Sequence, residues 1–351
     1  MELIKKSSRR YWQILGLISI GLLLYMSVPF LDVIIYGIFI YYVTRPIYER
    51  IDDRIKRRNV SAFVSLFLLI LPVIIIAIYT SSIASFELTR FMEGIDYTIP
   101  LGYLNKAIEE LSSIGQQLTP QELWEFIKEN PSLQDILIVP IAGLVNILFK
   151  LFLMFTIAFY LLKDGHKLRK WFSEKVLGED VKLSERFFNS IDEDLNRVFF
   201  GNILVALFTA LIAITLFYIL NLFAPQYLGI PYPFLLGILC GIAIFIPGIG
   251  IKIVWVPMAL YLVIQAYVNN ILFTGWWFLL VFLVAVFFLV DLSPDLILRP
   301  YISAKKVHTG VMLLAYLFGY IVFGFMGLFL GPIIVVLVTN FMSIILPEIR
   351  K

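Results

Sequence analysis

A lysine inside an apolar stretch is the first residue whose chemistry needs an explanation. Lys150 follows Asn146 by one helical turn, and both lie in the apolar run 140–162. A lysine costs roughly 2.5 to 3.5 kcal/mol at the centre of a membrane-spanning helix. A carboxylate, a water-filled cavity, or a late helix start that lets the side chain reach the membrane surface would offset this cost. The carboxylates considered as partners are Asp32, Asp291 and Asp295.

Two aspartates and a second lysine stand at the edges of other apolar runs. Asp291 and Asp295 are four residues apart, with Pro294 between them. A carboxylate near a membrane edge can bind a proton or a cation, but capping of a helix that starts at Leu296 explains this pair equally well. Lys252 follows a Pro-Gly turn and is expected to mark its cytoplasmic end. Four amide side chains are expected to be hydrogen-bond partners between helices: Asn202, Asn221, Gln265 and Asn340.

The composition indicates that lipid surrounds most of the chain. Of the 351 residues, 60% are hydrophobic and 15% are charged, whereas soluble domains average about 45–50% apolar and about 25% charged residues. The net charge of +3 is too small and too scattered for a nucleic-acid partner. The only cysteine, Cys240, and the two histidines, His166 and His308, lie in or beside apolar runs. No metal centre, redox chemistry or cofactor is therefore expected.

Membrane helices must position these residues. A helix needs about 20 apolar residues to cross the hydrocarbon core, and the sequence offers such runs one after another, which predicts an all-α polytopic membrane protein. The first two runs are joined near Pro29 and are read as retained helices. The apolar runs are 11–28, 30–43, 61–83, 140–162, 199–223, 234–268, 278–290 and 310–346.

Basic residues predict which connections face the cytoplasm, because Lys and Arg favour that side. They are concentrated at the N-terminus, at the C-terminus and in the two internal segments 45–58 and 163–197. Both termini are therefore predicted to be cytoplasmic. The chain then divides into membrane helices at 1–83, an outer segment at 84–139, and a region at 140–351 that holds one more helix, the cytoplasmic segment 163–197 and the broken hairpins.

The outer segment 84–139 has an amphipathic pattern. It is rich in Asp and Glu, and its apolar residues recur every three or four positions. Thr119, Pro120 and Glu122 form a capping box with proline at the first helical position. The pattern predicts two extracellular amphipathic helices whose apolar faces lie on the membrane, on the helical bundle or on a neighbouring subunit.

Proline and glycine interrupt two apolar runs in the second half. The first break reads Ile246-Pro-Gly-Ile-Gly250, and the second lies within 310–346, which is too long for one straight crossing. Freed backbone groups at such breaks hold ions or polar substrates in transporters, whereas close packing of helices is the alternative explanation. The residues expected at the two hairpin tips are Pro247, Gly248, Gly250, Gly324, Gly327, Gly331 and Pro332.

The sequence lacks the motifs of membrane enzymes and of nucleotide-driven pumps. It has no Gly-x-Ser-Gly of rhomboid proteases, and Gly250 is followed by Ile251 where an intramembrane aspartyl protease would have aspartate. The nucleotide-binding loop Gly-x-x-x-x-Gly-Lys-Ser/Thr is also missing. The protein is therefore not expected to be an enzyme, and any transport must be secondary. A membrane scaffold without transport activity, whose outer segment binds a partner, is the alternative.

Short motifs in the second half follow a definite order. They are Gly201-Asn202, Gly229-Ile-Pro231, Ile246-Pro-Gly-Ile-Gly250, Arg299-Pro300, and Gly324-x-x-Gly327-x-x-x-Gly331-Pro332. In this order and spacing the chain resembles the autoinducer-2 exporter family, the perM-like permeases, and the likeness in topology covers essentially the whole chain. Where many members have a His-Pro pair, this sequence has His308-Thr309-Gly310.

The resemblance implies a multi-pass plasma-membrane protein with about eight main helical segments, cytoplasmic termini and assembly as a homo-oligomer, for which a pentamer is one arrangement. It also implies export of autoinducer-2, as in some members, or sodium/proton antiport, as in others. Asp291, Asp295 and Arg299 would lie at the cytoplasmic junction between the two hairpins. We therefore expect a secondary transporter of a small polar solute or a monovalent cation. The expected contacts for the ion or substrate are Lys150, Asn146, Asp291, Asp295 and Arg299.

Overall fold

The computed structural model describes the residues 2–93, 139–176, 181–246, 249–294, 297 and 307–350. These residues form helices joined by short turns, with no strand among them, and seven helical stretches are long and apolar enough to cross a membrane. The predicted all-α polytopic membrane fold is thus confirmed. The amphipathic helices predicted within 84–139 fall mainly on 94–138, which lies outside the described residues.

The chain divides into two compact units. The larger unit comprises Met1–Ala62 and Ile157–Lys351, and the smaller unit comprises Phe63–Thr156. The smaller unit contains most of α3 (Arg58–Glu93) and the first part of α7 (Val139–Val176). Its described apolar side chains are mostly exposed, which is the condition of helices surrounded by lipid.

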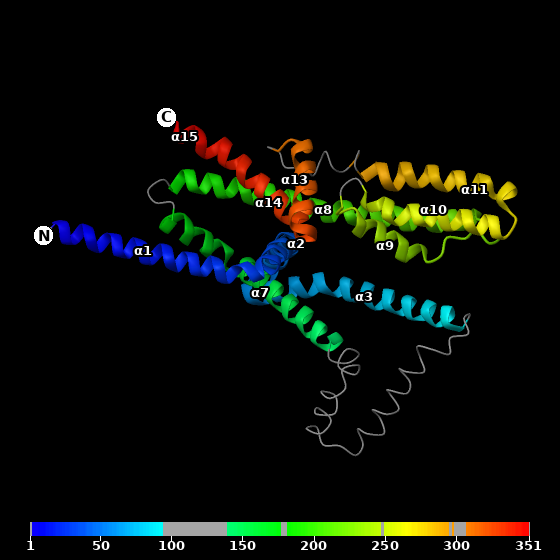
Figure 1. Cartoon of the computed structure of the whole chain (residues 1–351), viewed down its shortest axis with the longest axis horizontal. Coiled ribbons are helices and arrows are strands. Elements are labelled where there is room, and N and C mark those ends of the chain that lie inside the picture. Colours follow the sequence, from blue (N-terminus) through cyan, green and yellow to red (C-terminus); the bar gives the residue numbers. More distant parts are fainter. Residues whose placement is uncertain are drawn as a thin grey trace, which may run out of the picture. The chain divides into compact units, whose positions relative to one another are not determined.

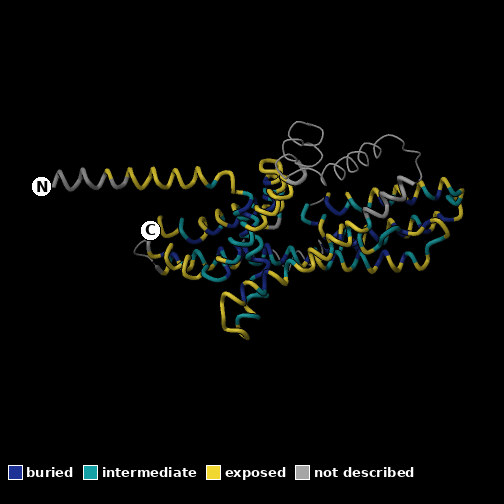
Figure 2. The backbone as a smooth tube through the Cα atoms, turned by 90° about the horizontal axis from the view of Figure 1, so that it is seen from below, coloured by how far each residue is buried: buried dark blue, intermediate teal, exposed yellow. Residues whose placement is uncertain are grey.

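Two helices separated by one turn begin the larger unit. Helix α1 (Glu2–Ser27) and helix α2 (Leu31–Ile55) are joined by the single 3₁₀ turn η1 (Val28–Phe30), where Pro29 stands at the start of the turn. The described side chains of α1 are exposed almost throughout (Figure 2). Helix α2 continues twelve residues beyond the predicted end at Val43. The basic residues Arg45 to Arg54 therefore lie on a helix and not in a loop.

Helix α8 (Val181–Phe223) is the central element of the larger unit. It packs against α2, α9, α14 and the π-helix η3, and its N-terminal part also contacts the end of α7. Arg169 on α7 donates a hydrogen bond to Asn189 on α8, and the rings of Phe172 and Phe188 are 5.7 Å apart. The predicted cytoplasmic segment 163–197 thus consists of the ends of two long helices that pack together.

Four elements that follow α8 pack around its second half. They are α9 (Pro233–Ala243), α10 (Gly250–Val268), α11 (Leu272–Ala285) and the π-helix η3 (Val286–Leu292), and Figure 1 shows α9, α10 and α11 beside α8. A Cβ atom at Gly241 would lie 2.6 Å from the carbonyl oxygen of Ala206, so α9 approaches the backbone of α8 too closely for a larger residue.

The connection from α8 to α9 is buried although it is not helical. Leu228 is fully buried and Ile230 is 3% exposed. Asn221 accepts a hydrogen bond from the N–H of Ile230 at 2.7 Å and donates one to its carbonyl oxygen at 2.9 Å. Non-helical backbone is tolerated at membrane depth only where protein groups satisfy it. Asn221 performs this function for the connection between α8 and α9.

A second hairpin ends the chain. Helix α13 (Thr309–Phe323), the 3₁₀ turn η5 (Gly324–Met326) and helix α14 (Gly327–Asn340) form it, and the π-helix η6 (Phe341–Ile345) and α15 (Leu346–Ile349) follow. Figure 1 shows α13 and α14 side by side. A Cβ atom at Gly331 would lie 2.1 Å from the carbonyl oxygen of Ala315, so the two helices touch backbone to backbone.

Candidate functional site

Both predicted helix breaks occur where the proline and glycine pattern indicated. Gly250 is the first residue of α10, and a Cβ atom there would lie 1.7 Å from the carbonyl oxygen of Ala243, the last residue of α9. The turn between these helices therefore depends on a residue without a side chain. Pro247 and Gly248, the other residues predicted at this tip, lie outside the described residues.

The second break is shorter than predicted. Gly324 has φ +62° and ψ −147°, a backbone conformation that essentially only glycine adopts. Gly327 already begins α14, and Gly331 and Pro332 lie buried inside that helix. A Cβ atom at Gly327 would lie 1.7 Å from the carbonyl oxygen of Gly319. Of the predicted tip residues, Gly324 makes the turn, whereas Gly327 and Gly331 allow α13 and α14 to pack closely.

An aromatic cluster brings the two breaks together. Phe245 in the first break and Phe325 in the second both contact Phe329 on α14, with ring centroids 6.3 Å and 5.8 Å apart. Phe39 on α2 lies 4.6 Å from Phe329 and 5.5 Å from Phe199 on α8. These separations are typical of attractive ring pairs. The aromatic cluster, defined as Tyr36, Phe39, Phe199, Phe245, Phe325 and Phe329, joins α2, α8, α14 and both breaks.

A buried polar network lies on the same two helices, α8 and α14. Asn340, the last residue of α14, is fully buried, and Asp194 on α8 is 4% exposed. Asn340 Nδ2 donates a hydrogen bond to Asp194 Oδ2 at 2.9 Å, and Ser190 Oγ donates one to Asn340 Oδ1 at 2.6 Å. This polar network of Ser190, Asp194 and Asn340 leads directly into the π-helix η6. Such π-helical turns frequently mark functional sites.

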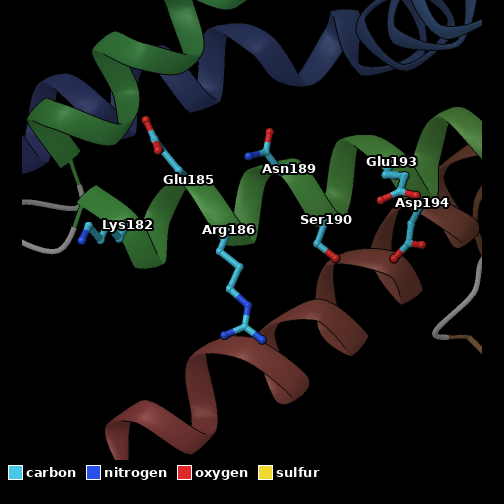
Figure 3. A pocket seen from close by; sticks show the side chains of 7 residues that line it. All are labelled: Lys182, Glu185, Arg186, Asn189, Ser190, Glu193 and Asp194. Atoms are coloured by element: carbon cyan, nitrogen blue, oxygen red, sulfur yellow. The ribbon is translucent and has the colours of Figure 1, made fainter.

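A cavity opens beside the polar network. Its volume is about 470 Å³, and polar or charged side chains of α8 line it. Figure 3 shows Ser190 and Asp194 on the side of α8 that faces the C-terminal helices, whereas Glu185 and Asn189 point to the other side. The lining residues are Lys182, Glu185, Arg186, Asn189, Ser190, Glu193 and Asp194. The cavity therefore borders two members of the network, Ser190 and Asp194.

Ion pairs surround the polar network without entering it. Arg45 on α2 binds Asp192 on α8, with its Nη1 atom 2.6 Å from Oδ2, and it also pairs with Glu49 on its own helix. Arg197 pairs with Glu193 one turn earlier on α8. Arg45 thus neutralises Asp192, whose side chain is 25% exposed, and not the more deeply buried Asp194.

A second charged pair links α10 to the π-helix η3. Lys252 Nζ lies 2.8 Å from Asp291 Oδ2, and the Asp291 side chain is 10% exposed. The sequence predicted Asp291 as an ion contact and Lys252 only as a marker of the turn, and the structure brings the two together. Asp295 and Arg299, the other residues predicted at this junction, lie outside the described residues.

Lys150 and Asn146, the residues predicted as contacts in the apolar run 140–162, lie in the smaller unit. Lys150 is half-buried and Asn146 is exposed, both on α7. Of the three carboxylates considered as partners of Lys150, Asp32 and Asp291 belong to the larger unit, where Asp291 is paired with Lys252, and Asp295 lies outside the described residues. The helix breaks, the aromatic cluster and the polar network also belong to the larger unit, and Lys150 and Asn146 stay candidates from sequence.

The four amides that were expected to link helices behave in three ways. Asn340 links α14 to α8, and Asn202 on α8 donates a hydrogen bond to Tyr316 on α13 at 2.7 Å, as predicted. Asn221 instead hydrogen-bonds the backbone of Ile230 in the buried connection between α8 and α9. Gln265 accepts a hydrogen bond from Asn269 at the end of its own helix.

Asp194 is the buried charged residue that the sequence did not lead us to expect. It lies in a stretch where acidic and basic residues are equally frequent, so its charge alone gives no signal. The signal is its position in the apolar pattern of Phe187, Ile191 and Val198, where steps of three and four residues place Asp194 on the apolar face of the helix. A carboxylate on that face indicates a buried charge.

Comparison with known proteins shows which family the chain belongs to. The model of the AI-2E family transporters matches residues 14–346. Relatives named as inferred transport proteins include one from Archaeoglobus fulgidus, 27% identical over 94% of this chain and 93% of its own length, and one from Methanocaldococcus jannaschii, 27% identical over 90% of each chain. A third, from Aquifex aeolicus, is 24% identical over 86% of this chain and 85% of its own. The chain therefore belongs to the AI-2E transporter family, whose members are multi-pass membrane proteins with a role in transport.

Proposed function

We propose that this protein is a secondary transporter of the plasma membrane that exports a small polar solute, such as autoinducer-2, or exchanges sodium ions for protons. Membership of the AI-2E family supports a role in transport. The basic residues of 45–58 and 163–197 support cytoplasmic termini. The homo-oligomeric assembly implied by the family resemblance is part of this proposal.

The observation that carries the proposal is the meeting of both helix breaks at the aromatic cluster. Phe245 and Phe325 are 80 residues apart in sequence, yet both rings contact Phe329. Transporters of several folds bind their cargo where helices are interrupted, and constrictions of hydrophobic side chains close membrane pathways by excluding water. The cluster supports a closed point in a pathway between α2, α8 and α14.

The polar network supports an entry to this pathway. It lies on α8 and α14, the helices that also contribute Phe199 and Phe329 to the aromatic cluster. Asp194 and Phe199 are five residues apart on α8, which corresponds to about 7.5 Å along a helix. A polar solute in the cavity would therefore reach the cluster within one to two helical turns, and separation of the rings would let it pass.

Flux through the purified protein in lipid vesicles tests the proposal. Vesicles that contain a pH-sensitive dye would be given sodium, lithium or choline gradients, and uptake of labelled autoinducer-2 would be measured in parallel. We expect wild-type protein to move protons in response to sodium or lithium, or to carry the solute, whereas empty vesicles do neither. Protein that assembles normally but shows neither activity would favour the scaffold alternative and contradict the proposal.

A further inference from the structure

The inference concerns the carboxylate of Asp194, whose hydrogen-bond partner is a neutral amide. Asn340 donates to Asp194 Oδ2 and is itself held by Ser190 Oγ, so the network contains a carboxylate, an amide and a hydroxyl. Only 4% of Asp194 is exposed. A hydrogen bond from an amide stabilises a buried carboxylate but leaves its charge in place.

Most of the charged groups on the neighbouring elements have other partners near this position. On α2, Arg45 pairs with Asp192; on α7, Arg169 donates to Asn189; on α8 itself, Arg197 pairs with Glu193. From α14 and η6, Asn340 is the group that bonds Asp194, and it is uncharged. Arg186 and Lys182 line the cavity further along α8. In the described part of the chain, no basic side chain forms an ion pair with Asp194.

A buried carboxylate in such surroundings is a binding site for a small cation. Neutralisation by a proton or by a bound ion removes the cost of keeping the charge away from water. Carboxylate, amide and hydroxyl oxygens are the ligands that hard cations prefer. The cavity of about 470 Å³ is lined by both Ser190 and Asp194, so an ion can reach the carboxylate from outside.

We propose that Asp194, together with Ser190 and Asn340, binds the monovalent cation, a proton or a sodium ion, whose movement is coupled to transport. This inference rests on the proposed function and assigns the residues that carry out its coupling step. A cation at Asp194 replaces the hydrogen bond from Asn340 Nδ2 to the carboxylate, so binding changes how α8 and α14 are tied together. These two helices also carry Phe199 and Phe329, which lie 6.4 Å apart in the aromatic cluster. Occupation of the site is thereby linked to the contact that closes the pathway.

Ion-dependent unfolding of the full-length protein tests the site without reference to transport. Thermal unfolding in detergent would be followed in sodium chloride and in choline chloride at equal ionic strength, each over a series of pH values. A ligand that binds only the folded protein raises its unfolding temperature. We expect sodium, or a lower pH in choline, to raise the unfolding temperature of the wild type, and Asp194→Asn to lose this response.

A neighbouring carboxylate supplies the matched control. Glu193 lies one residue before Asp194, is exposed and pairs with Arg197, so Glu193→Gln should respond as the wild type does. Because Asp194→Asn alters a buried hydrogen bond and is expected to lower stability, Ser190→Ala provides a second variant that keeps the carboxylate. It should raise the sodium concentration of half-maximal effect by about tenfold, as loss of a supporting hydrogen bond does at other cation sites.

Each outcome decides the inference. A sodium response that depends on Asp194 assigns a sodium site, and a pH response that depends on Asp194 assigns a proton site. Equal responses of wild type and Asp194→Asn, or a wild type that responds to neither cation, would overturn the assignment. Solute flux that is unchanged in Asp194→Asn would also overturn it while leaving the proposed function intact. Absence of any flux from wild-type vesicles would instead overturn the proposed function, and the unfolding titration would still decide whether the site binds a cation.

Discussion

The ring of Phe245 lies 6.3 Å from the ring of Phe329, and this contact joins the first helix break to the hairpin that contains the second. Phe245 follows the end of α9 by two residues, and Phe329 lies in the first turn of α14. Movement of either hairpin must therefore alter the packing of the other. The two breaks are therefore coupled through the packing of Phe329.

Truncation of Phe329 should both destabilise the protein and open the pathway. Phe329 is 6% exposed and contacts five other rings of the aromatic cluster. Phe329→Ala removes these contacts, so we expect a loss of about 3–5 kcal/mol in the free energy of unfolding and a higher passive leak of protons from vesicles. Thermal unfolding and dye-loaded vesicles measure the two effects. Phe273→Ala on α11 is the control, because Phe273 is 92% exposed, lies outside the aromatic cluster, and its removal should change both quantities little.

Gly327 should tolerate no side chain. The Cβ atom of Gly327→Ala would lie 1.7 Å from the carbonyl oxygen of Gly319, so α13 and α14 would have to move apart. We expect a loss of about 1–3 kcal/mol in the free energy of unfolding, as for other overpacked cores, measured by thermal unfolding in detergent. Gly165→Ala on α7 meets no atom within 4 Å. It should be neutral or stabilise the protein by up to about 1 kcal/mol, and equal losses in both variants would refute the close-packing explanation.

Gly324 should be required for its backbone conformation and not for space. Its φ of +62° with ψ −147° is strained for any residue with a side chain, although a Cβ atom there would meet nothing within 4 Å. Gly324→Ala should therefore cost about 1–3 kcal/mol of stability. Gly143→Ala also meets no neighbouring atom but lies inside helix α7, and it should cost nothing. Comparison of the two unfolding temperatures separates backbone strain from crowding; similar values would contradict this account.

The pair of Lys252 and Asp291 should respond to exchange of its charges. Asp291→Asn leaves Lys252 beside a neutral amide, and we expect a loss of about 1.5–3 kcal/mol, the usual range for a hydrogen bond to a charged group. Because 43% of the Lys252 side chain is exposed, solvent screening keeps the effect toward the lower end. The double variant Lys252→Asp with Asp291→Lys should recover part of the stability in thermal unfolding. A double variant no more stable than the worse single variant would argue against a direct interaction.

The sequence was sufficient for the membrane fold and for the positions of the breaks. Apolar runs of membrane length leave little choice but helices, and Gly250 and Gly324 stand where the helices are indeed interrupted. What it did not predict is that Phe245 and Phe325 converge on Phe329. Hydrophobic periodicity reports which face of a helix is apolar but not which distant helix it meets.

The polar groups were harder to predict for a different reason. Asn340 was expected to link helices, and it does, but its partner Asp194 was one of many charged residues in 163–197. The connection from α8 to α9 carries no charged residue, which by itself does not distinguish an exposed loop from a buried one, and Leu228 and Ile230 are in fact buried. Its lack of charge fits an interior position as well, and only the hydrogen bonds from Asn221 reveal how that position is possible.

The π-helix η6 gives the end of the chain a particular kind of freedom. A π turn holds one residue more than an α turn, and moving this surplus residue toward the end of the helix rotates the residues that it passes by about 100°. Because η6 begins directly after Asn340, such a rotation leaves the glycine contact of α13 with α14 untouched. The residues after Asn340 can thus turn about the helix axis while the packing of α13 against α14 stays unchanged.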